Sequence, residues 1–497
     1  MPATFSKYYL FVLSITTLLI YSAVLDNRYI WDDFEYIEIL KLHEKDQLLF
    51  NAFSESFYIS DNYYRPIAIF SILFEAKFSN ANPFWGHLTN LLFHIFNSVL
   101  IYLISNSIYA RSNIIPKEKS KTVALFSSLF FAMNPNLIES VSWISGRFDL
   151  MVTLFSLLII YIVICKQDNK FSFLLVSTCY LIGALTKEMI VALPLSIFTL
   201  LIFCKRPSNS INNTYILMKH KFVYLYPIII GGLAYLIIRY FALGYLVIAE
   251  ENQYKMPFTD SLEHVHIVIK TIGIYIIKLV LPFNNISPIH QFPENNDWWD
   301  LYTVVGLLSI GVTIIGLFFK ISIQISLIIL IYFTALLPVL NIIPAGIGLN
   351  IVQERFLTLP LALVSCVIGI PIYSFIQNLS SSLHKYLYGV IAFWLLLSAM
   401  TIHSIVPMWK NNDIFWIWNI KSHPNSYIAN NNYAALLFSN GQYTNSLKVF
   451  KTSYELNRTE AALKMIARIY LLTKEFSKAE ISYNELLKNH PTTTSRA

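Results

Sequence analysis

Apolar stretches of membrane-spanning length recur along most of this chain, and they constrain its fold more than any other feature. Examples are residues 8–25, 88–108, 222–241, 301–319 and 386–406. A helix needs about 20 apolar residues to cross the hydrocarbon layer, and helices satisfy their own backbone hydrogen bonds there. Hydrophobic residues are 56% of the 497 and charged residues 13%, whereas soluble domains carry roughly 25% charged residues. We therefore predict an all-α, polytopic membrane helix bundle.

About eleven spans are predicted within residues 1–406. They lie near residues 8–25, 86–108, 121–137, 148–165, 171–186, 189–204, 222–242, 302–319, 322–340, 356–376 and 386–406. Residues 262–281 are apolar too, but ionisable groups are costly inside a span, so we expect an interfacial or re-entrant helix there. The first run has a long core and no small-x-small cleavage site, which predicts a retained helix and not a removed signal.

The distribution of charge predicts the orientation in the membrane. Basic residues cluster in 111–121 and 205–221, whereas residues 26–61 are rich in Asp and Glu. The positive-inside rule places the basic segments in the cytoplasm and the acidic first loop, residues 26–85, outside it. Richness in Ile, Asn and Lys favours a bacterial inner membrane, with the endoplasmic reticulum as the alternative. Because the net charge of +7 follows this topology, we expect no nucleic-acid partner.

Residues 407–497 differ from the rest of the chain because they are polar, rich in Asn and helical in pattern. Tyr443 and Phe476 are 33 residues apart, as are Phe450 and Tyr483. A tetratricopeptide unit is a helical hairpin of about 34 residues with small and aromatic residues at such positions. We predict an extracytoplasmic tetratricopeptide-like tail of about two repeats. A plain antiparallel helical hairpin is the alternative.

The first loop carries two adjacent carboxylates, Asp32 and Asp33, directly after the first predicted span. A carboxylate can act as a general base for an attacking hydroxyl, and burial or a like charge nearby raises its pKa toward a useful range. The alternative is structural: Asp32 caps the next helix and Asp33 adds favourable charge to its first turn.

A polar stripe follows in an otherwise apolar helix. His87, Asn90, His94 and Asn97 fall within an arc of about 80° at about 100° per residue, so the stripe faces a bundle interior or a cavity. Substrate binding and interhelical hydrogen bonding both explain it. Arg65 precedes this helix in the motif Tyr-Arg-Pro and is a further candidate for the pocket.

The predicted second external turn contains Glu139 and Arg147, which helical spacing places on one face with Ser142, Trp143 and Gly146. The planar guanidinium of Arg147 suits a phosphate. The alternative for Arg147 is an ion pair with Glu139 or Asp149 that orders the turn.

Further charged residues lie at predicted external helix ends, namely Lys187, Arg239, Glu354 and Arg355. Any one basic residue among them could be an interfacial snorkelling side chain. Several that converge on one face would form a site for a lipid-linked phosphate. No Walker A, dinucleotide-binding, zinc-protease or Cys-x-x-Cys motif occurs, so the sequence predicts no cofactor and no metal ligands, and it leaves a divalent metal ion open.

In combination, these motifs resemble the transmembrane and tetratricopeptide-repeat containing O-mannosyltransferases of the GT-C glycosyltransferase superfamily. The motifs that carry the resemblance are Trp31-Asp32-Asp33, Tyr64-Arg65-Pro66, His87 to Asn90, Asn134-Pro135 to Asp149, Lys187-Glu188, Gln353-Glu354-Arg355 and the repeat tail. The chain departs from the family in having about two repeats and Asn134 where a histidine is usual.

The resemblance implies inverting transfer of a sugar, typically mannose, from a polyprenyl or dolichyl phosphate to Ser or Thr hydroxyls of proteins. It implies that Asp32 or Asp33 is the base and that Arg147, Lys187 and Arg355, with Arg239, hold the phosphate. Arg65, His87, Asn90, His94, Glu139 and Glu354 would shape the pocket. The implied partners are the lipid-linked donor, membrane lipid and an acceptor protein docked by the tail.

Two other interpretations remain open from the sequence. A GT-C transferase could act on a lipid or glycan acceptor with the same membrane chemistry. A non-enzymatic transporter or membrane-anchored scaffold would use the external acids structurally, although transporters place functional charges near the bilayer midplane.

Overall fold

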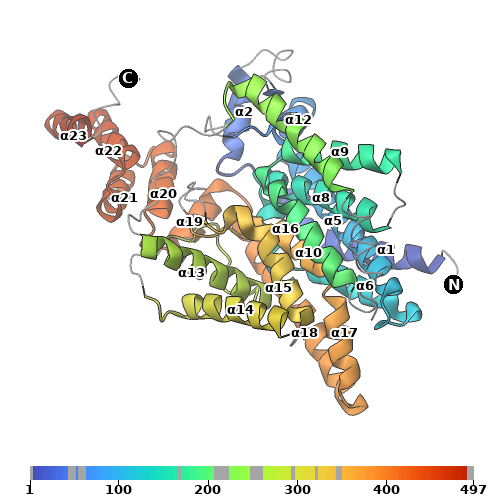
Figure 1. Cartoon of the computed structure of the whole chain (residues 1–497). Coiled ribbons are helices and arrows are strands. Elements are labelled where there is room, and N and C mark those ends of the chain that lie inside the picture. Colours follow the sequence, from blue (N-terminus) through green and yellow to red (C-terminus); the bar gives the residue numbers. More distant parts are fainter. Residues whose placement is uncertain are drawn as a thin grey trace. The chain divides into compact units, whose positions relative to one another are not determined.

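The structure is a computed structural model that describes residues 4–42, 52–53, 63–165, 169–205, 223–246, 261–292, 297–319, 323–342 and 350–489. Within these ranges the chain is helical and contains no β-strand, as predicted. The chain divides into two compact units (Figure 1). The first comprises Met1–Ile286 and Phe292–Pro407, and the second comprises Ser287–Gln291 and Met408–Ala497.

The first unit is a bundle of α-helices joined by short 3-10 turns. Its described α-helices are α1 (Thr4–Tyr21), α2 (Asp33–Leu42), α4 (Pro66–Phe78), α5 (Pro83–Arg111), α6 (Lys117–Ala132), α7 (Ile138–Ser142), α8 (Arg147–Cys165), α9 (Lys170–Ala184), α10 (Leu193–Lys205), α12 (Leu225–Leu243), α13 (Ser261–Val280), α14 (Leu301–Phe318), α15 (Ile323–Leu336), α16 (Thr358–Ser365), α17 (Gly369–Asn378) and α18 (Ser381–Ile405). The 3-10 turns that concern the site are η3 (Ile144–Gly146), η4 (Glu188–Ala192) and η7 (Glu354–Leu357).

Six helical segments of the described chain are long and apolar enough to cross a membrane. They are Lys7–Asp26, Pro83–Arg111, Ile144–Cys165, Leu225–Leu243, Leu301–Phe318 and Ser381–Trp409. The pair Glu354–Ser365 and Gly369–Asn378, bent by 53°, makes a seventh if it is one broken span. The predicted count of eleven is not confirmed. Helices α6, α9 and α15 have 16, 15 and 14 residues, or about 21–24 Å, against a hydrocarbon core of about 30 Å.

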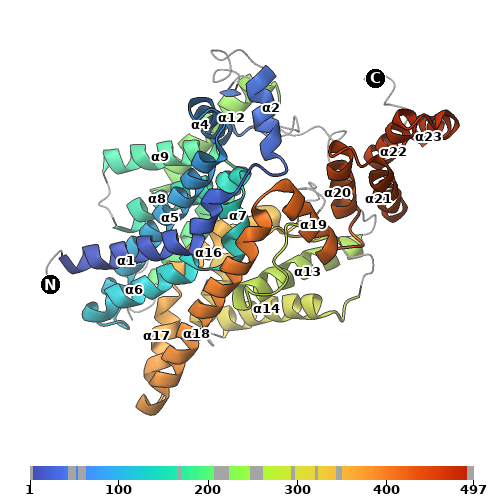
Figure 2. The same cartoon turned by 180° about the vertical axis from the view of Figure 1, so that it is seen from behind.

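Helix α5 is the centre of the bundle because α1, α6, α8 and α16 all pack against it, and α1, α5 and α6 lie side by side in Figure 2. The predicted polar stripe on α5 faces the interior: His87, Asn90, His94 and Asn97 are all fully buried. At the other end of α5, the Tyr109 hydroxyl accepts a hydrogen bond from the Gly369 amide at 2.9 Å and contacts Ser127 at 2.8 Å. These polar contacts fix the neighbours of α5 in position.

Helices α13 and α14 form a close antiparallel pair, side by side in Figure 1. Residues 262–281, expected to be interfacial or re-entrant, lie mostly in the one continuous helix α13, so a re-entrant bend is not observed. The ionisable groups in α13 have partners. Lys270 contacts Asp300 at 3.3 Å, and the buried Lys278 contacts Glu354 at 2.7 Å. These partners offset the desolvation penalty that argued against burial.

The second unit contains α19 (Asn412–Ser422), α20 (Tyr427–Ser439), α21 (Tyr443–Leu456), α22 (Glu460–Leu472) and α23 (Phe476–Asn489). Helices α20 and α21 form one hairpin, α22 and α23 a second, and α19 packs on α20. Both hairpins have their shared core at Ala434, Phe450, Ala462, Ile466 and Ala479.

The two hairpins repeat with a period of 33 residues. Helices α20 and α22 begin at Tyr427 and Glu460, and α21 and α23 begin at Tyr443 and Phe476. The linkers repeat too, because Gly441 (φ 74°) and Lys474 (φ 63°) both adopt the left-handed conformation that ends a helix. This agrees with the period in the sequence, whereas the assignment to the tetratricopeptide class stays a prediction.

Replacement of Gly306 tests the packing of α13 on α14. A Cβ atom at Gly306 would overlap the backbone carbonyl of Ile269, so Gly306→Ala has to separate the two helices. We expect the free energy of unfolding to fall by about 1–3 kcal/mol, measured by thermal denaturation in detergent. Gly311→Ala in the same helix is the control. It has nothing within 4 Å and gains helix propensity, so an equal loss with this variant would contradict the packing argument.

Candidate functional site

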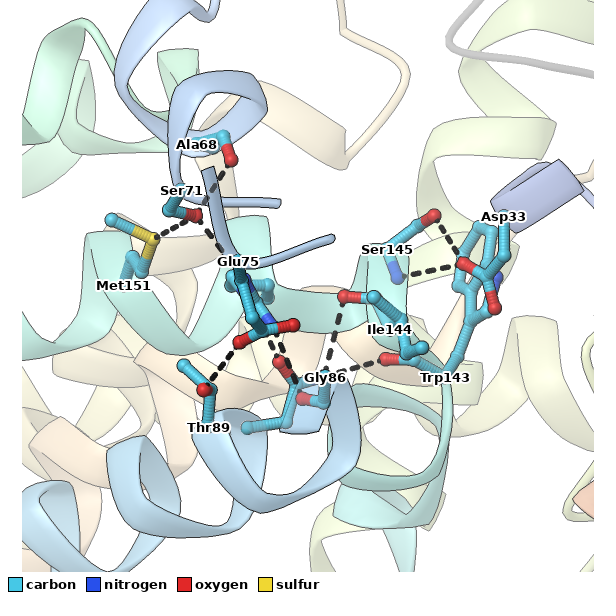
Figure 3. Close-up of polar contacts among 12 residues, drawn as sticks. Asp33, Ala68, Ser71, Glu75, Gly86, Thr89, Trp143, Ile144, Ser145 and Met151 are labelled. Carbon is cyan, nitrogen blue, oxygen red and sulfur yellow. Dashed lines mark hydrogen bonds and ion pairs between the residues drawn. The ribbon is translucent and has the colours of Figure 1, made fainter. Parts of the chain in front are cut away.

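The first loop is attached to the α7–α8 turn through the carboxylate of Asp33 (Figure 3). One oxygen, Oδ1, accepts hydrogen bonds from the amide of Ser145 at 3.1 Å and from its hydroxyl at 2.7 Å. The other, Oδ2, accepts one from the Ile30 amide at 3.2 Å. Burial raises the pKa of Asp33 to about 7, and these donors oppose that rise because they favour the ionised form. Asp33 is thus engaged on both oxygens in holding the loop.

Asp32, the neighbouring acid, is partly exposed and lies within the electrostatic field of Arg355. Burial raises its pKa to about 6, while the positive charge of Arg355 opposes the rise. A carboxylate with this pKa is mostly ionised at neutral pH and still basic enough to accept a proton. Of the two candidate bases, Asp32 is the one with accessible surface and a cation nearby.

Trp31 gives this loop an unusual backbone. Its φ is 51°, in the left-handed region that a bulky residue adopts only when its surroundings enforce it, at about 1–3 kcal/mol. Its ring stacks on Trp143 with centroids 5.1 Å apart and planes at 13°. The Arg355 guanidinium lies 4.9 Å from the same Trp143 ring. Trp31, Trp143 and Arg355 therefore form one contiguous contact beside Asp32.

Three basic side chains from distant segments lie within electrostatic reach of one another, each with an acidic partner, and one of them, Arg355, is also within reach of Asp32. Their ion pairs are Arg65 with Glu188 at 2.7 Å, Lys187 with Asp149 at 2.5 Å and Arg355 with Glu139 at 2.5 Å. Lys187 lies in the break between α9 and η4. Burial lowers the pKa of Lys187 to about 8, the Asp149 charge opposes the fall, and the charges of Arg65 and Arg355 add to it. Because Arg65 and Arg355 both lower the pKa of Lys187, each of them lies within electrostatic reach of Lys187.

Arg239 lies at the edge of this group of cations. It is buried, and its Nη1 donates to the Tyr235 hydroxyl at 3.2 Å. Tyr235 in turn is within electrostatic reach of Glu188 and Arg65. Arg239 therefore joins the site through Tyr235.

Arg147 occupies a separate, fully buried position. Its Nη2 contacts Glu75 at 3.0 Å and the Gly86 carbonyl at 3.0 Å, and its Nε donates to Asn90 at 3.0 Å. The ion pair anticipated with Glu139 or Asp149 is not observed, because Glu139 binds Arg355 and Asp149 binds Lys187. Arg147 clamps α4 and α5 to the start of α8.

The expected single helical face from Glu139 to Arg147 is wrong. Trp143 is extended, with φ −98° and ψ 129°, and it separates α7 from η3 and α8. The chain folds back on itself here, and glycine at position 146 permits the close approach, because a Cβ atom there would lie 2.5 Å from the Ser140 carbonyl oxygen. Glu139 and Arg147 consequently face different partners.

The other candidates for the pocket contact neighbouring parts of the bundle. Asn90 donates to the Trp143 carbonyl at 2.7 Å, and His94 contacts the Ala132 carbonyl at 3.0 Å. His87 is fully buried within the electrostatic reach of Arg147. Glu354 forms the buried ion pair with Lys278. The stripe thus makes interhelical contacts, as one of the two sequence interpretations held.

Glu75 and Ser145 were missed by the sequence reasoning. Glu75 is the sole acid in the apolar helix α4, and such an isolated charge signals a buried partner. Ser145 offers no comparable signal, because serines are frequent in this segment. Among the described residues, no cluster of three or more His, Cys, Asp or Glu side chains has the geometry of a metal site.

Comparisons with known proteins find distant, partial relatives. Protein O-mannosyl-transferase F38B6.6 of Caenorhabditis elegans is 22% identical over 196 residues, which is 38% of this chain and 27% of that protein. Protein O-mannosyl-transferase TMTC1 is 29% identical in Mus musculus and 28% in Homo sapiens, over 96 residues or 19% of this chain. The aligned parts span 9% and 10% of those two relatives. No family model matches the chain, and no solved structure matches it.

Removal of the Glu75 charge tests the role of Arg147 as a buried clamp. Glu75→Gln retains hydrogen-bonding capacity toward Thr89 but leaves the Arg147 cation without its counter-charge. We expect a loss of about 3 kcal/mol in the free energy of unfolding, measured by thermal denaturation. Glu475→Gln makes the same chemical change in the exposed pair with Lys478 and should leave the melting temperature unchanged. Equal effects of both variants would contradict the clamp.

Proposed function

We propose that this protein is a membrane-embedded glycosyltransferase that moves a sugar from a polyprenyl or dolichyl phosphate to a Ser or Thr hydroxyl of a protein. The names of the distant relatives favour mannose as the sugar. The apolar helices of the first unit fit a donor that remains dissolved in the bilayer.

One observation carries the proposal: the carboxylate of Asp32 lies within electrostatic reach of the Arg355 cation. Arg355 and Arg65 in turn lie within electrostatic reach of Lys187. Four segments remote in sequence contribute these groups. Transfer from a glycosyl phosphate needs a base for the acceptor proton and positive charge for the departing phosphate. Both requirements are met within one cluster.

In the proposed reaction, Asp32 removes the proton of the acceptor hydroxyl as that oxygen attacks the anomeric carbon. The bond from the anomeric carbon to the phosphate oxygen breaks, and polyprenyl phosphate leaves with the bonding electrons. Attack opposite the leaving group inverts the anomeric configuration through an oxocarbenium-like transition state. Asp33 acts as a positioning residue, because one of its oxygens attaches the loop to Ser145 and the other accepts a hydrogen bond from the Ile30 amide within the loop.

Lys187 and Arg355 are the proposed ligands of the donor phosphate, supported by Arg65 and Arg239. Their acidic partners hold them in place without substrate, which removes the need to order long side chains during the reaction. Arg147 is proposed as a positioning residue and not as a phosphate ligand, since its guanidinium is fully buried against Glu75, Asn90 and Gly86.

The second unit is proposed to present the acceptor protein. The 33-residue period of its two hairpins supports this role, because helical repeat proteins use extended concave surfaces for binding. The active site and the tail would lie on the extracytoplasmic side, in a bacterial inner membrane or the endoplasmic reticulum. A lipid or glycan acceptor remains the competing substrate.

Replacement of Asp32 tests the base. We expect Asp32→Asn to lower kcat by a factor of about 100 or more in membranes supplied with polyprenyl-phosphate mannose and an acceptor peptide. For the unchanged protein, kcat/KM should rise with pH through about 6, because the carboxyl must lose its proton before it can accept one. Glu35→Gln is the control, since burial raises the pKa of this nearby acid to about 7. The rise of kcat/KM with pH should stay in this variant if it belongs to Asp32. If Asp32→Asn retains full activity, the base lies elsewhere.

The pKa of Lys187 predicts where kcat/KM falls on the alkaline side of its dependence on pH. Only protonated Lys187 can stabilise a phosphate, so kcat/KM should fall as pH rises through about 8. Lys187→Arg keeps the positive charge at higher pH and should move this limb upward by one unit or more. A limb that stays in place in the variant would assign it to another group.

A further inference from the structure

The stacked pair of Trp31 and Trp143 is not used by the mechanism above, although it adjoins both reacting groups. The turn around Trp31 is held on each side. The Asp33 amide donates to the Ile30 carbonyl at 3.0 Å, and the Phe34 amide donates to the Trp31 carbonyl at 3.3 Å. Trp31 therefore keeps its left-handed backbone because its neighbours enforce it. Such enforced conformations cluster where a side chain must be aimed at a ligand.

The two rings differ in their surroundings. Trp143 is 3% exposed, and its carbonyl accepts a hydrogen bond from Asn90, so it forms a fixed backing. Trp31 remains partly exposed while its ring stacks on that backing. The pair thus presents a rigid aromatic wall. Asp32 follows Trp31 in the chain, and the Arg355 guanidinium lies over the Trp143 ring, so the wall adjoins both groups.

We infer that Trp31, backed by Trp143, is the wall of the donor-sugar subsite and binds the apolar face of a hexopyranose. This inference rests on the proposed function. In a glycosyl phosphate the anomeric carbon of the sugar ring bears the phosphate, and the acceptor attacks that same carbon from the opposite side. The ring therefore lies next to both the phosphate-binding cations and the base. The stacked indoles adjoin Arg355 and Asp32, so they are placed to contact that ring, whose axial C–H groups pack on a flat indole surface.

The test compares two ligands that differ only in the sugar. Full-length protein in lipid nanodiscs is titrated with polyprenyl-phosphate mannose and with polyprenyl phosphate. Trp31→Gly removes the ring and suits the left-handed backbone, so the turn is retained. We expect it to raise the Kd of the mannose-bearing lipid about tenfold and to change the Kd of the sugar-free lipid less than twofold. Trp31→Phe should keep the Kd of the mannose-bearing lipid within about threefold of its value for the unchanged protein, since a flat ring remains.

Ala81→Gly is the matched control, because Ala81 also has a positive φ of 55° but lies in the turn between α4 and α5. It should leave both Kd values unchanged. If Trp31→Gly weakens both lipids equally, or neither, the ring is not a sugar wall and the inference is overturned while the proposed function stands. If the unchanged protein binds neither lipid, the proposed function fails and the inference fails with it.

Discussion

Desolvation makes a buried charge costly unless a counter-charge and hydrogen bonds compensate it, and this constraint orders the first unit. Arg147 and Glu75, Lys187 and Asp149, Lys278 and Glu354, and Arg355 and Glu139 are ion pairs with at least one deeply buried member. Each pair joins segments that are between 38 and 216 residues apart. In an apolar bundle these pairs select one arrangement of helices among many that bury similar apolar area.

The sequence predicted those features that depend on local pattern. Apolar length located the long helices, helical periodicity placed His87, Asn90, His94 and Asn97 in the interior, and the 33-residue spacing anticipated the matching hairpins. Prediction from the sequence failed where the role of a residue depends on a partner that is remote in the chain. The fold brings Glu75, 72 residues distant, to Arg147, and the isolation of Glu75 in an apolar helix indicates a buried partner but not which residue it is. The count of eleven spans is not confirmed, because helices of 14–16 residues pass a composition test as readily as longer ones.

The acidic pair in the first loop shows how one motif can hold two roles. Asp32 and Asp33 are indistinguishable by composition, and only their surroundings separate them. Asp33 is closed in by Ser145 and Ile30, whereas Asp32 retains accessible surface and a nearby cation. The two acids follow Trp31, whose backbone is left-handed, and although adjacent in the chain they meet different environments.

The equivalent linkers at Gly441 and Lys474 have a consequence for how the tail can vary. Because both hairpins close through the same left-handed turn, the two helices within each hairpin are joined in the same way, and a further hairpin of this kind would need no new type of turn. Lysine at the second turn bears a steric penalty that glycine avoids at the first. The tail can therefore vary by whole hairpins that share one type of turn.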